Sequence, residues 1–150
     1  QESAPKPSAV RDKAKVLAMI QALEADPLGP KAKDQRTALV YWLTEVPDLT
    51  VALCPDVLAP TDKFGKYKGE LTGHLMFSQA AYILEHPGAS AEKMPAQVAG
   101  AKGALRVYRT LLKADAKAAT DVLNELVATE ERGELEAHVA RGWQVCKASK

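Results

Sequence analysis

The stretch GELTGHLMFSQAAYILEH, residues 69–86, limits the possible folds of this chain more than any other segment. It predicts one helix over 68–85, because no proline interrupts the stretch and His86-Pro87-Gly88 is a stop signal. Apolar residues fall on nearly every side of this helix, whereas a surface helix has one apolar stripe and a polar face. We therefore predict a central helix that other elements cover on most sides.

The rest of the chain also favours helices. It has no Asn-Gly or Asp-Gly turn and no period-two run of β-branched residues, so strand signals are nearly absent. Helical patterns bounded by Pro, Gly and N-cap residues predict further helices over 8–24, 31–46, 91–114, 120–131 and from 134 onward. Residues 47–67 are expected to be irregular, with one helical turn at 48–53. The predicted fold class is all-α: a single-domain irregular helical bundle of about five to six helices.

The domain is expected to begin at the first helix. Residues 1–7 are polar and contain two prolines, so we predict a flexible N-terminal tail there and a single helical domain over 8–150. Asp12 is expected to lie mostly outside the inner face of the first helix. Helical spacing predicts that this inner face consists of Val10, Leu17, Ile20 and Leu23.

Length and charge exclude several classes of protein. A chain of 150 residues with 47% apolar and 26% charged residues is typical of one globular domain. Lys and Arg number 20 against 19 Asp and Glu, so the formal net charge is +1. This balance gives no electrostatic reason to expect nucleic acid as a partner. No apolar run approaches the roughly 18 residues that span a bilayer, so we expect no transmembrane segment.

The two cysteines, Cys54 and Cys146, are expected to form a disulfide bond. The chain begins with Gln1 rather than Met, and a polar start rich in Pro, Ser and Ala often follows removal of a signal peptide. Exported proteins with an even number of cysteines usually pair them. We therefore predict that the protein is exported, either periplasmic or extracellular. The bridge would stabilise the fold by roughly 4 to 5 kcal/mol on the chain-entropy model.

Five polar or ring-bearing residues recur at every fourth position of the expected central helix. Each step of four residues turns the helix by about 400°, so the series drifts by about 40° per step. Neighbouring members can touch, but the two ends of the series face nearly opposite ways. One pocket would therefore use about three neighbours. The series consists of Glu70, His74, Ser78, Tyr82 and His86.

In the first functional hypothesis, this stripe lines a groove or pocket of a binding protein. His74, Gln79 and Tyr82 offer donors and acceptors beside apolar side chains, a mixture typical of small-ligand sites. The structural alternative gives each polar group an internal partner: His74 bonds to Glu70 or a backbone carbonyl, and Ser78 bonds back to its own helix. The candidate ligand-binding residues are His74, Ser78, Tyr82 and Glu70.

The second functional hypothesis is a His-dependent or metal-dependent hydrolase centred on His74. Ser78 lies one turn from His74, but no strained turn exposes it as a nucleophile. Glu70 with His74, and Glu134 with His138, form two Glu-xxx-His pairs, a metal-ligand spacing in some helical bundles. The chain has only three His and no cysteine cluster, which argues against a metal.

Glycines predict how the central helix packs. Glycine inside a helix costs about 1 kcal/mol relative to alanine, so several glycines in neighbouring helices indicate close approach. We expect the helices over 68–85 and 91–114 to pack tightly through small residues. The glycines concerned are Gly69, Gly73, Gly100 and Gly103.

These observations favour an exported helical domain that binds a protein, a peptide or a small ligand without catalysis. We expect no catalytic residue, no cofactor and no bound metal. The hydrolase centred on His74 is the alternative. The identity of the partner does not follow from the residues.

Overall fold

The computed structural model describes residues 5–149. Within this range the chain forms six α-helices, four short 3-10 turns and no strand, which confirms the all-α prediction. Residues 1–4 and 150 lie outside the described residues. The N-terminal tail predicted for 1–7 and the domain predicted for 8–150 therefore remain predictions. The helices are α1 (Ala9–Ala25), α2 (Ala32–Glu45), α3 (Lys68–Glu85), α4 (Met94–Ala114), α5 (Asp121–Glu131) and α6 (Leu135–Ala148).

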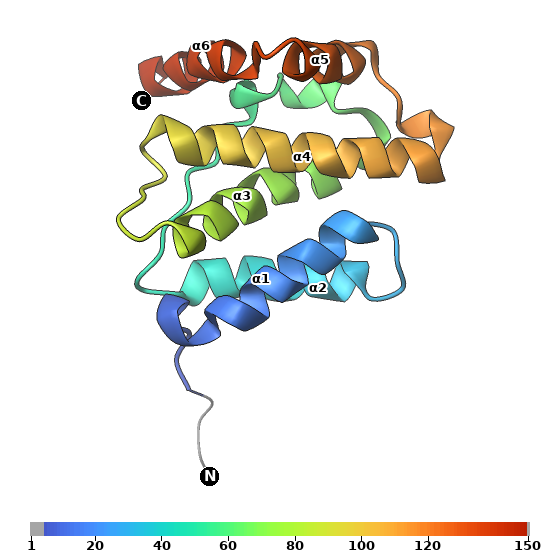
Figure 1. The fold of residues 1–150 in the computed structure, drawn as a ribbon. Helices are drawn as coiled ribbons and strands as arrows, with labels where there is room; N and C mark the ends of the chain where they lie inside the picture. The colour runs from blue at the N-terminus through green and yellow to red at the C-terminus, as the bar shows by residue number, and fades with distance from the viewer. Residues whose placement is uncertain (1–4, 150) are drawn as a thin grey trace.

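Figure 1 shows the helices in three layers. α1 and α2 form one outer layer, α3 and α4 lie antiparallel in the middle, and α5 and α6 form the other outer layer. The buried apolar side chains form two clusters, and α3 contributes to both of them. Leu71 and Leu75 belong to the cluster shared with α4, α5 and α6, whereas Phe77, Ala80 and Leu84 belong to the cluster shared with α1 and α2. The predicted central position of this helix is confirmed.

α3 and α4 pack closely because α4 carries glycine where the two helices meet. A Cβ added to Gly100 would lie 2.8 Å from the carbonyl oxygen of Leu75. A Cβ added to Gly103 would lie 1.7 Å from Oγ of Ser78. Protein interiors leave no room for such overlaps, so the contact requires glycine at both positions. The predicted close approach of these two helices is thus confirmed for Gly100 and Gly103.

The two glycines of α3 do not take part in this contact, so that part of the glycine prediction is wrong. A Cβ at Gly69 would meet nothing within 4 Å. A Cβ at Gly73 would meet only the ring of Phe77, 3.4 Å away. Gly69 lies in the first turn of α3, outside the contact surface with α4, and spacing alone did not reveal this.

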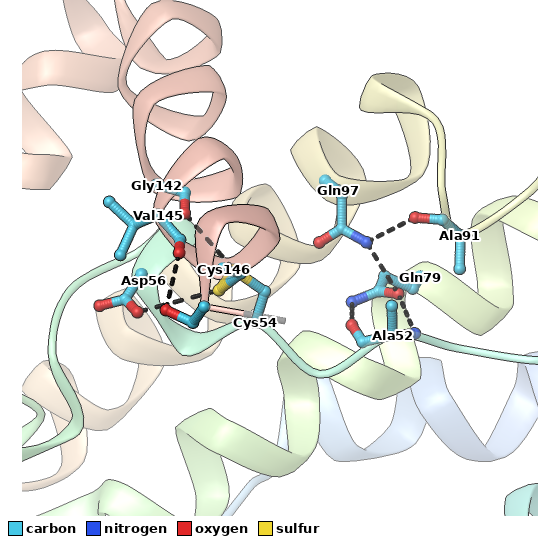
Figure 2. The surroundings of a disulfide bond; sticks show 10 residues. Ala52, Cys54, Asp56, Gln79, Ala91, Gln97, Gly142, Val145 and Cys146 are labelled. Carbon is cyan, nitrogen blue, oxygen red and sulfur yellow. Dashed lines mark hydrogen bonds between the residues drawn. A yellow bond between two sulfur atoms is a disulfide. The ribbon is translucent and has the colours of Figure 1, made fainter.

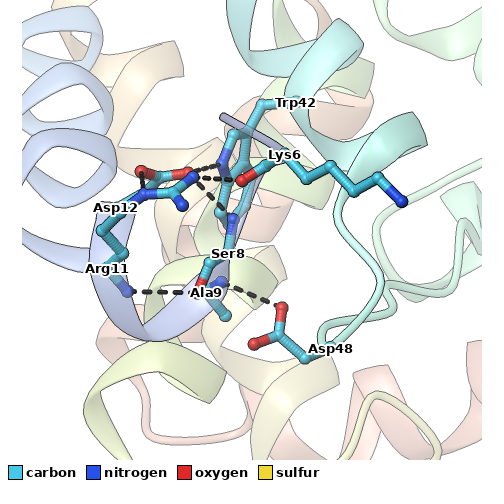
Figure 3. A network of polar contacts seen from close by, with 7 residues as sticks. All are labelled: Lys6, Ser8, Ala9, Arg11, Asp12, Trp42 and Asp48. Atoms are coloured by element: carbon cyan, nitrogen blue, oxygen red, sulfur yellow. Dashed lines mark hydrogen bonds and ion pairs between the residues drawn. The ribbon is translucent and has the colours of Figure 1, made fainter. Parts of the chain in front are cut away.

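A polar network joins α1 to α2 (Figure 3). Ser8 caps α1, and Oδ2 of Asp12 accepts hydrogen bonds from the amide of Ser8 and from Nε1 of Trp42, the latter at 2.8 Å. The Trp42 bond is the main reason that the pKa of Asp12 falls to about 2. Asp12 therefore bridges two helices, and its predicted position outside the interface is wrong. Val10 is 85% exposed because the chain buries Ala9 instead, so its predicted inward position is also wrong.

The irregular segment between α2 and α3 is attached to α6 by the disulfide (Figure 2). The sulfur atoms of Cys54 and Cys146 lie 1.99 Å apart, as the pairing prediction requires. The prediction of a helical turn at 48–53 is wrong: residues 49–54 are not helical. The first short helix after α2 is η1 (Pro55–Val57), where proline suits the first helical position. The backbone of η1 approaches α6 so closely that a Cβ at Gly142 would lie 1.9 Å from the carbonyl oxygen of Asp56.

Gln79 holds the same segment against α3, and Gln97 of α4 links Gln79 to the loop before α4 (Figure 2). Gln79 donates to the carbonyl of Ala52 at 2.8 Å and accepts from the amide of Ala52 at 3.1 Å. Gln97 donates to the carbonyl of Ala91 at 2.7 Å and to Oε1 of Gln79 at 3.3 Å. Burial of an amide is tolerated when its hydrogen bonds are made. Gln79 therefore serves the fold and has little capacity left for a ligand.

Close backbone approach at Gly142 yields a first prediction. Gly142→Ala should lower the free energy of unfolding by about 1 to 3 kcal/mol, because the added methyl group overlaps backbone atoms of η1 that cannot move independently. Gly69→Ala is the matched control and should raise stability by up to about 1 kcal/mol, because alanine favours the helix and meets no neighbour. Urea titrations of both variants check this. Equal destabilisation by both would contradict the packing described here.

Candidate functional site

A groove of about 730 Å³ lies between α3, α4 and α6, and we call it the three-helix groove. Tyr82 lies on its α3 side. Charged side chains come from Glu85 on α3, Lys102 and Arg106 on α4, and Glu136 on α6. A concave apolar surface with a few polar groups is the usual form of a small-molecule site. Most of the remaining lining is apolar and small: Ala81, Met94, Pro95, Val98, Ala99, Ala137 and Ala140.

Ser78 lines this groove and has an unusual environment. The residue is 3% exposed, and its Oγ has no hydrogen-bond partner within residues 5–149. A serine inside a helix ordinarily bonds to the carbonyl one turn earlier when it is buried. The bond back to its own helix that we expected for Ser78 is not made. A buried hydroxyl without a partner costs about 1 to 3 kcal/mol. The Ser78 hydroxyl lies in the contact with Gly103 of α4, where close packing encloses it.

His74 is buried but lies outside the lining of the groove. Its Nε2 lies 2.9 Å from Oε2 of Glu24, a residue of α1. Arg106 of α4 donates to the same carboxylate, with its Nε 2.6 Å from Oε1. Glu24 therefore joins α1, α3 and α4 through one carboxylate. The partners expected for His74, Glu70 or a backbone carbonyl, are wrong because α1 covers this face of α3.

The carboxylate of Glu24 remains ionised over a wide pH range. Burial acts to raise the pKa, but the hydrogen bonds from His74 and Arg106 outweigh it and lower the pKa from 4.5 to about 2. The same ion pair raises the pKa of Arg106. This carboxylate therefore holds the Arg106 guanidinium beside the three-helix groove with a fixed charge.

The structure divides the four predicted ligand-binding residues between different surfaces. Ser78 and Tyr82 line the three-helix groove, and His74 is enclosed behind it. Glu70 lines a separate cavity of about 670 Å³ between α2 and α3. Tyr82 stacks on His86, with ring centroids 3.9 Å apart. The drift of the stripe around the helix accounts for this division, and the ligand-binding role of all four residues stays a prediction.

The two Glu-xxx-His pairs do not meet. Nε2 of His138 lies 2.7 Å from the carbonyl oxygen of Leu58, whereas His74 faces α1. Within the part of the chain that the structure describes, no group of three or more His, Cys, Asp or Glu is placed to hold a metal ion. The expectation that the protein binds neither metal nor cofactor remains a prediction.

The charged residues at or beside the groove were missed by sequence reasoning. Lys102 and Arg106 are spaced by four residues on α4, which places them on one face beside Gly103, and this spacing was the available signal. Glu24 has no such signal, because it meets Arg106 across 82 positions of sequence. Glu136 lies in the first turn of α6, where acidic residues are common for reasons unrelated to a site.

Comparisons with protein-family models, with curated proteins and with solved structures give no match to this chain. Among residues 5–149, no helix is long and apolar enough to cross a membrane. The case for a site therefore depends on the geometry of the groove itself.

Ser78 yields a second prediction. Ser78→Ala should leave the free energy of unfolding unchanged or raise it by up to about 1 kcal/mol, because it removes a buried hydroxyl that has no partner. Ser8→Ala makes the same chemical change at the N-cap of α1 and should lower stability by about 1 kcal/mol. Denaturant titrations compare the two. A clear loss of stability in Ser78→Ala would mean that its hydroxyl has a structural role.

Glu24 yields a third prediction, on acid stability. Its pKa in the folded protein is lower than in the unfolded chain, so its ionised form stabilises the fold above about pH 4.5. This contribution is lost as the pH falls from 4.5 toward 2. Glu24→Gln should therefore make stability depend less steeply on pH in this window. Denaturant titrations at stepped pH measure the slope of the free energy of unfolding against pH. Glu131→Gln, an exposed control on α5, should keep the slope of the parent protein. An unchanged slope in Glu24→Gln would contradict the role assigned to Glu24.

Proposed function

We propose that this protein is a non-catalytic binding protein whose three-helix groove takes a small ligand with an apolar body. The observation that carries the proposal is the groove itself, a concave surface of about 730 Å³ between three helices. Most of its walls are small apolar side chains, so a ligand would gain hydrophobic contact along the groove. Tyr82 adds an aromatic surface at the side of the groove.

Export belongs to this proposal. A disulfide between Cys54 and Cys146 supports it, because disulfides persist mainly in oxidising compartments. A binding protein outside the cytoplasm would encounter ligands that are present in the medium or in the cell envelope. Alkylation of the unreduced, denatured protein followed by mass measurement checks the pairing, since two alkylated thiols would remove this support.

The alternative, a hydrolase centred on His74, has weaker support. A serine nucleophile needs a base within hydrogen-bond reach. Nε2 of His74 bonds to Glu24, while Oγ of Ser78 has no partner among the described residues. The two side chains therefore do not form a nucleophile and base pair. Hydrolysis of an ester such as 4-nitrophenyl acetate that disappears in both Ser78→Ala and His74→Ala would favour this alternative over binding.

A fourth prediction tests the groove directly. The parent protein should bind the fluorescent probe anilinonaphthalene sulfonate saturably, because the probe combines an apolar ring system with a size suited to the groove. Ala140→Trp should weaken this binding by about tenfold or more, because the indole would occupy the space between α4 and α6.

The control for this experiment lies in the other cavity. Val40→Trp places the same side chain between α2 and α3 and should leave probe affinity unchanged. Near-ultraviolet circular dichroism confirms that both variants keep their tertiary packing, since a loosened fold would itself bind the probe. Equal probe affinity in the parent and Ala140→Trp, or loss only in Val40→Trp, would contradict the proposed function.

A further inference from the structure

We infer that a second copy of this chain docks on the surface between α2 and α3, so that two copies form a symmetric dimer. We call this surface the α2–α3 face; it consists of the residues that line the cavity of about 670 Å³ containing Glu70. The α2–α3 face shares no lining residue with the three-helix groove, so this inference does not depend on the proposed ligand.

The α2 side of this face is a ridge of exposed apolar side chains. Val40 is 45% exposed and Tyr41 is 67% exposed, and both line the cavity. The other apolar side of α2 is already used, because Leu39 and Trp42 pack in the cluster shared with α1. A surface helix of a monomer has one apolar stripe, so a second apolar stripe indicates a further packing partner.

The α3 side of the face is a hollow with two glycines in its lining. A Cβ added to Gly69 would meet nothing within 4 Å, and a Cβ added to Gly73 would meet only the ring of Phe77. Glycine inside a helix costs stability relative to alanine, and no close approach among the described residues requires glycine at these two positions. Because the ridge and the hollow lie on one face, two copies related by a twofold axis would fit ridge to hollow twice.

The charged residues of the face are divided between its two sides. Lys33 and Arg36 belong to α2, and Glu70 belongs to α3; these three are the charged residues of the lining. None of them forms an ion pair within residues 5–149. Arg36 donates one hydrogen bond, from Nη1 to the carbonyl oxygen of Pro27, 2.9 Å away. The face therefore carries both signs of charge, and neither sign is neutralised by an ion pair within one copy.

The positions of these charges select a second copy as the occupant. Figure 1 shows α2 and α3 running in the same direction, and Lys33 and Glu70 lie in the first turns of these helices. The two signs of charge therefore lie at the same end of the face, on opposite sides of the cavity. A twofold axis along the cavity would place α2 of each copy over α3 of the other. Lys33 and Arg36 would then meet Glu70 of the partner subunit, and this pairing of opposite charges would occur twice.

The size of the face determines the strength of the association. Its ten lining residues are fewer than the roughly 20 to 30 residues per side of a standard interface. We therefore expect a weak dimer, with a Kd of about 10 to 100 µM. The formal net charge of +1 adds little repulsion between two copies.

Sedimentation velocity of the full chain at increasing concentration measures the association. The parent protein should change from monomer to dimer between about 1 µM and 1 mM. Tyr41→Ala should weaken the dimer by about tenfold or more, because it removes the aromatic part of the ridge. Val145→Ala is the control, because it shortens an apolar side chain of α6 that is 53% exposed and lies outside the face. This variant should keep the Kd of the parent.

Charge reversal tests the twofold arrangement. Glu70→Lys, and separately Lys33→Glu combined with Arg36→Glu, should each weaken self-association by about tenfold or more, because like charges would meet in both halves of the interface. An equimolar mixture of these two variants should recover the dimer, because opposite charges then meet in both halves. Circular dichroism checks that each variant keeps the fold of the parent.

Three results would overturn the inference. They are a parent protein that stays monomeric up to about 1 mM, a Tyr41→Ala variant that associates as the parent does, and charge-reversed variants that do not associate when mixed. A monomeric parent would leave the α2–α3 face to a different protein partner, and the proposed function of the three-helix groove would be unaffected.

Discussion

The contact between α3 and α4 at Gly100 and Gly103 determines the rest of the structure. Glycine lets the two helices approach until their atoms touch, so α3 becomes enclosed between α4 and the layer of α1 and α2. The same contact places the hydroxyl of Ser78 against the α4 backbone, where the helix supplies no partner for it. α6 then crosses α4 with alanine at 137 and 140, and these small side chains leave the groove unfilled.

An ion pair between α1 and α4 fixes the position of Arg106 beside the groove. Glu24 reaches from α1 to His74 and Arg106, and its pKa of about 2 keeps it ionised at any physiological pH. A half-buried charge of this kind is tolerated because two donors compensate its partial desolvation. His74, one of the predicted ligand-binding residues, bonds to the same carboxylate that holds Arg106. The histidine itself is a part of the core.

The sequence was sufficient to predict the fold class, the central helix and the disulfide pair, since these follow from local periodicity, stop signals and cysteine count. The helix over 68–85 matches α3 because its stop signal and its apolar character are both local. Val10 and Asp12 were misplaced because helical spacing does not determine which of two adjacent faces meets Trp42. Of the residues that line the candidate groove, only Ser78 and Tyr82 were among the predicted site residues. Glu24, Lys102 and Arg106 join them through packing between distant segments, which a local pattern does not encode.

The most direct test of this account is a methyl NMR map of the full chain during addition of anilinonaphthalene sulfonate. The account predicts that methyl signals of the groove shift progressively with ligand, while those of Thr37 and Val40 in the cavity between α2 and α3 stay unchanged. The groove methyl signals are those of Ala81, Val98, Ala99 and Ala140. Shifts confined to Thr37 and Val40, or an unchanged spectrum at saturating anilinonaphthalene sulfonate, would contradict it.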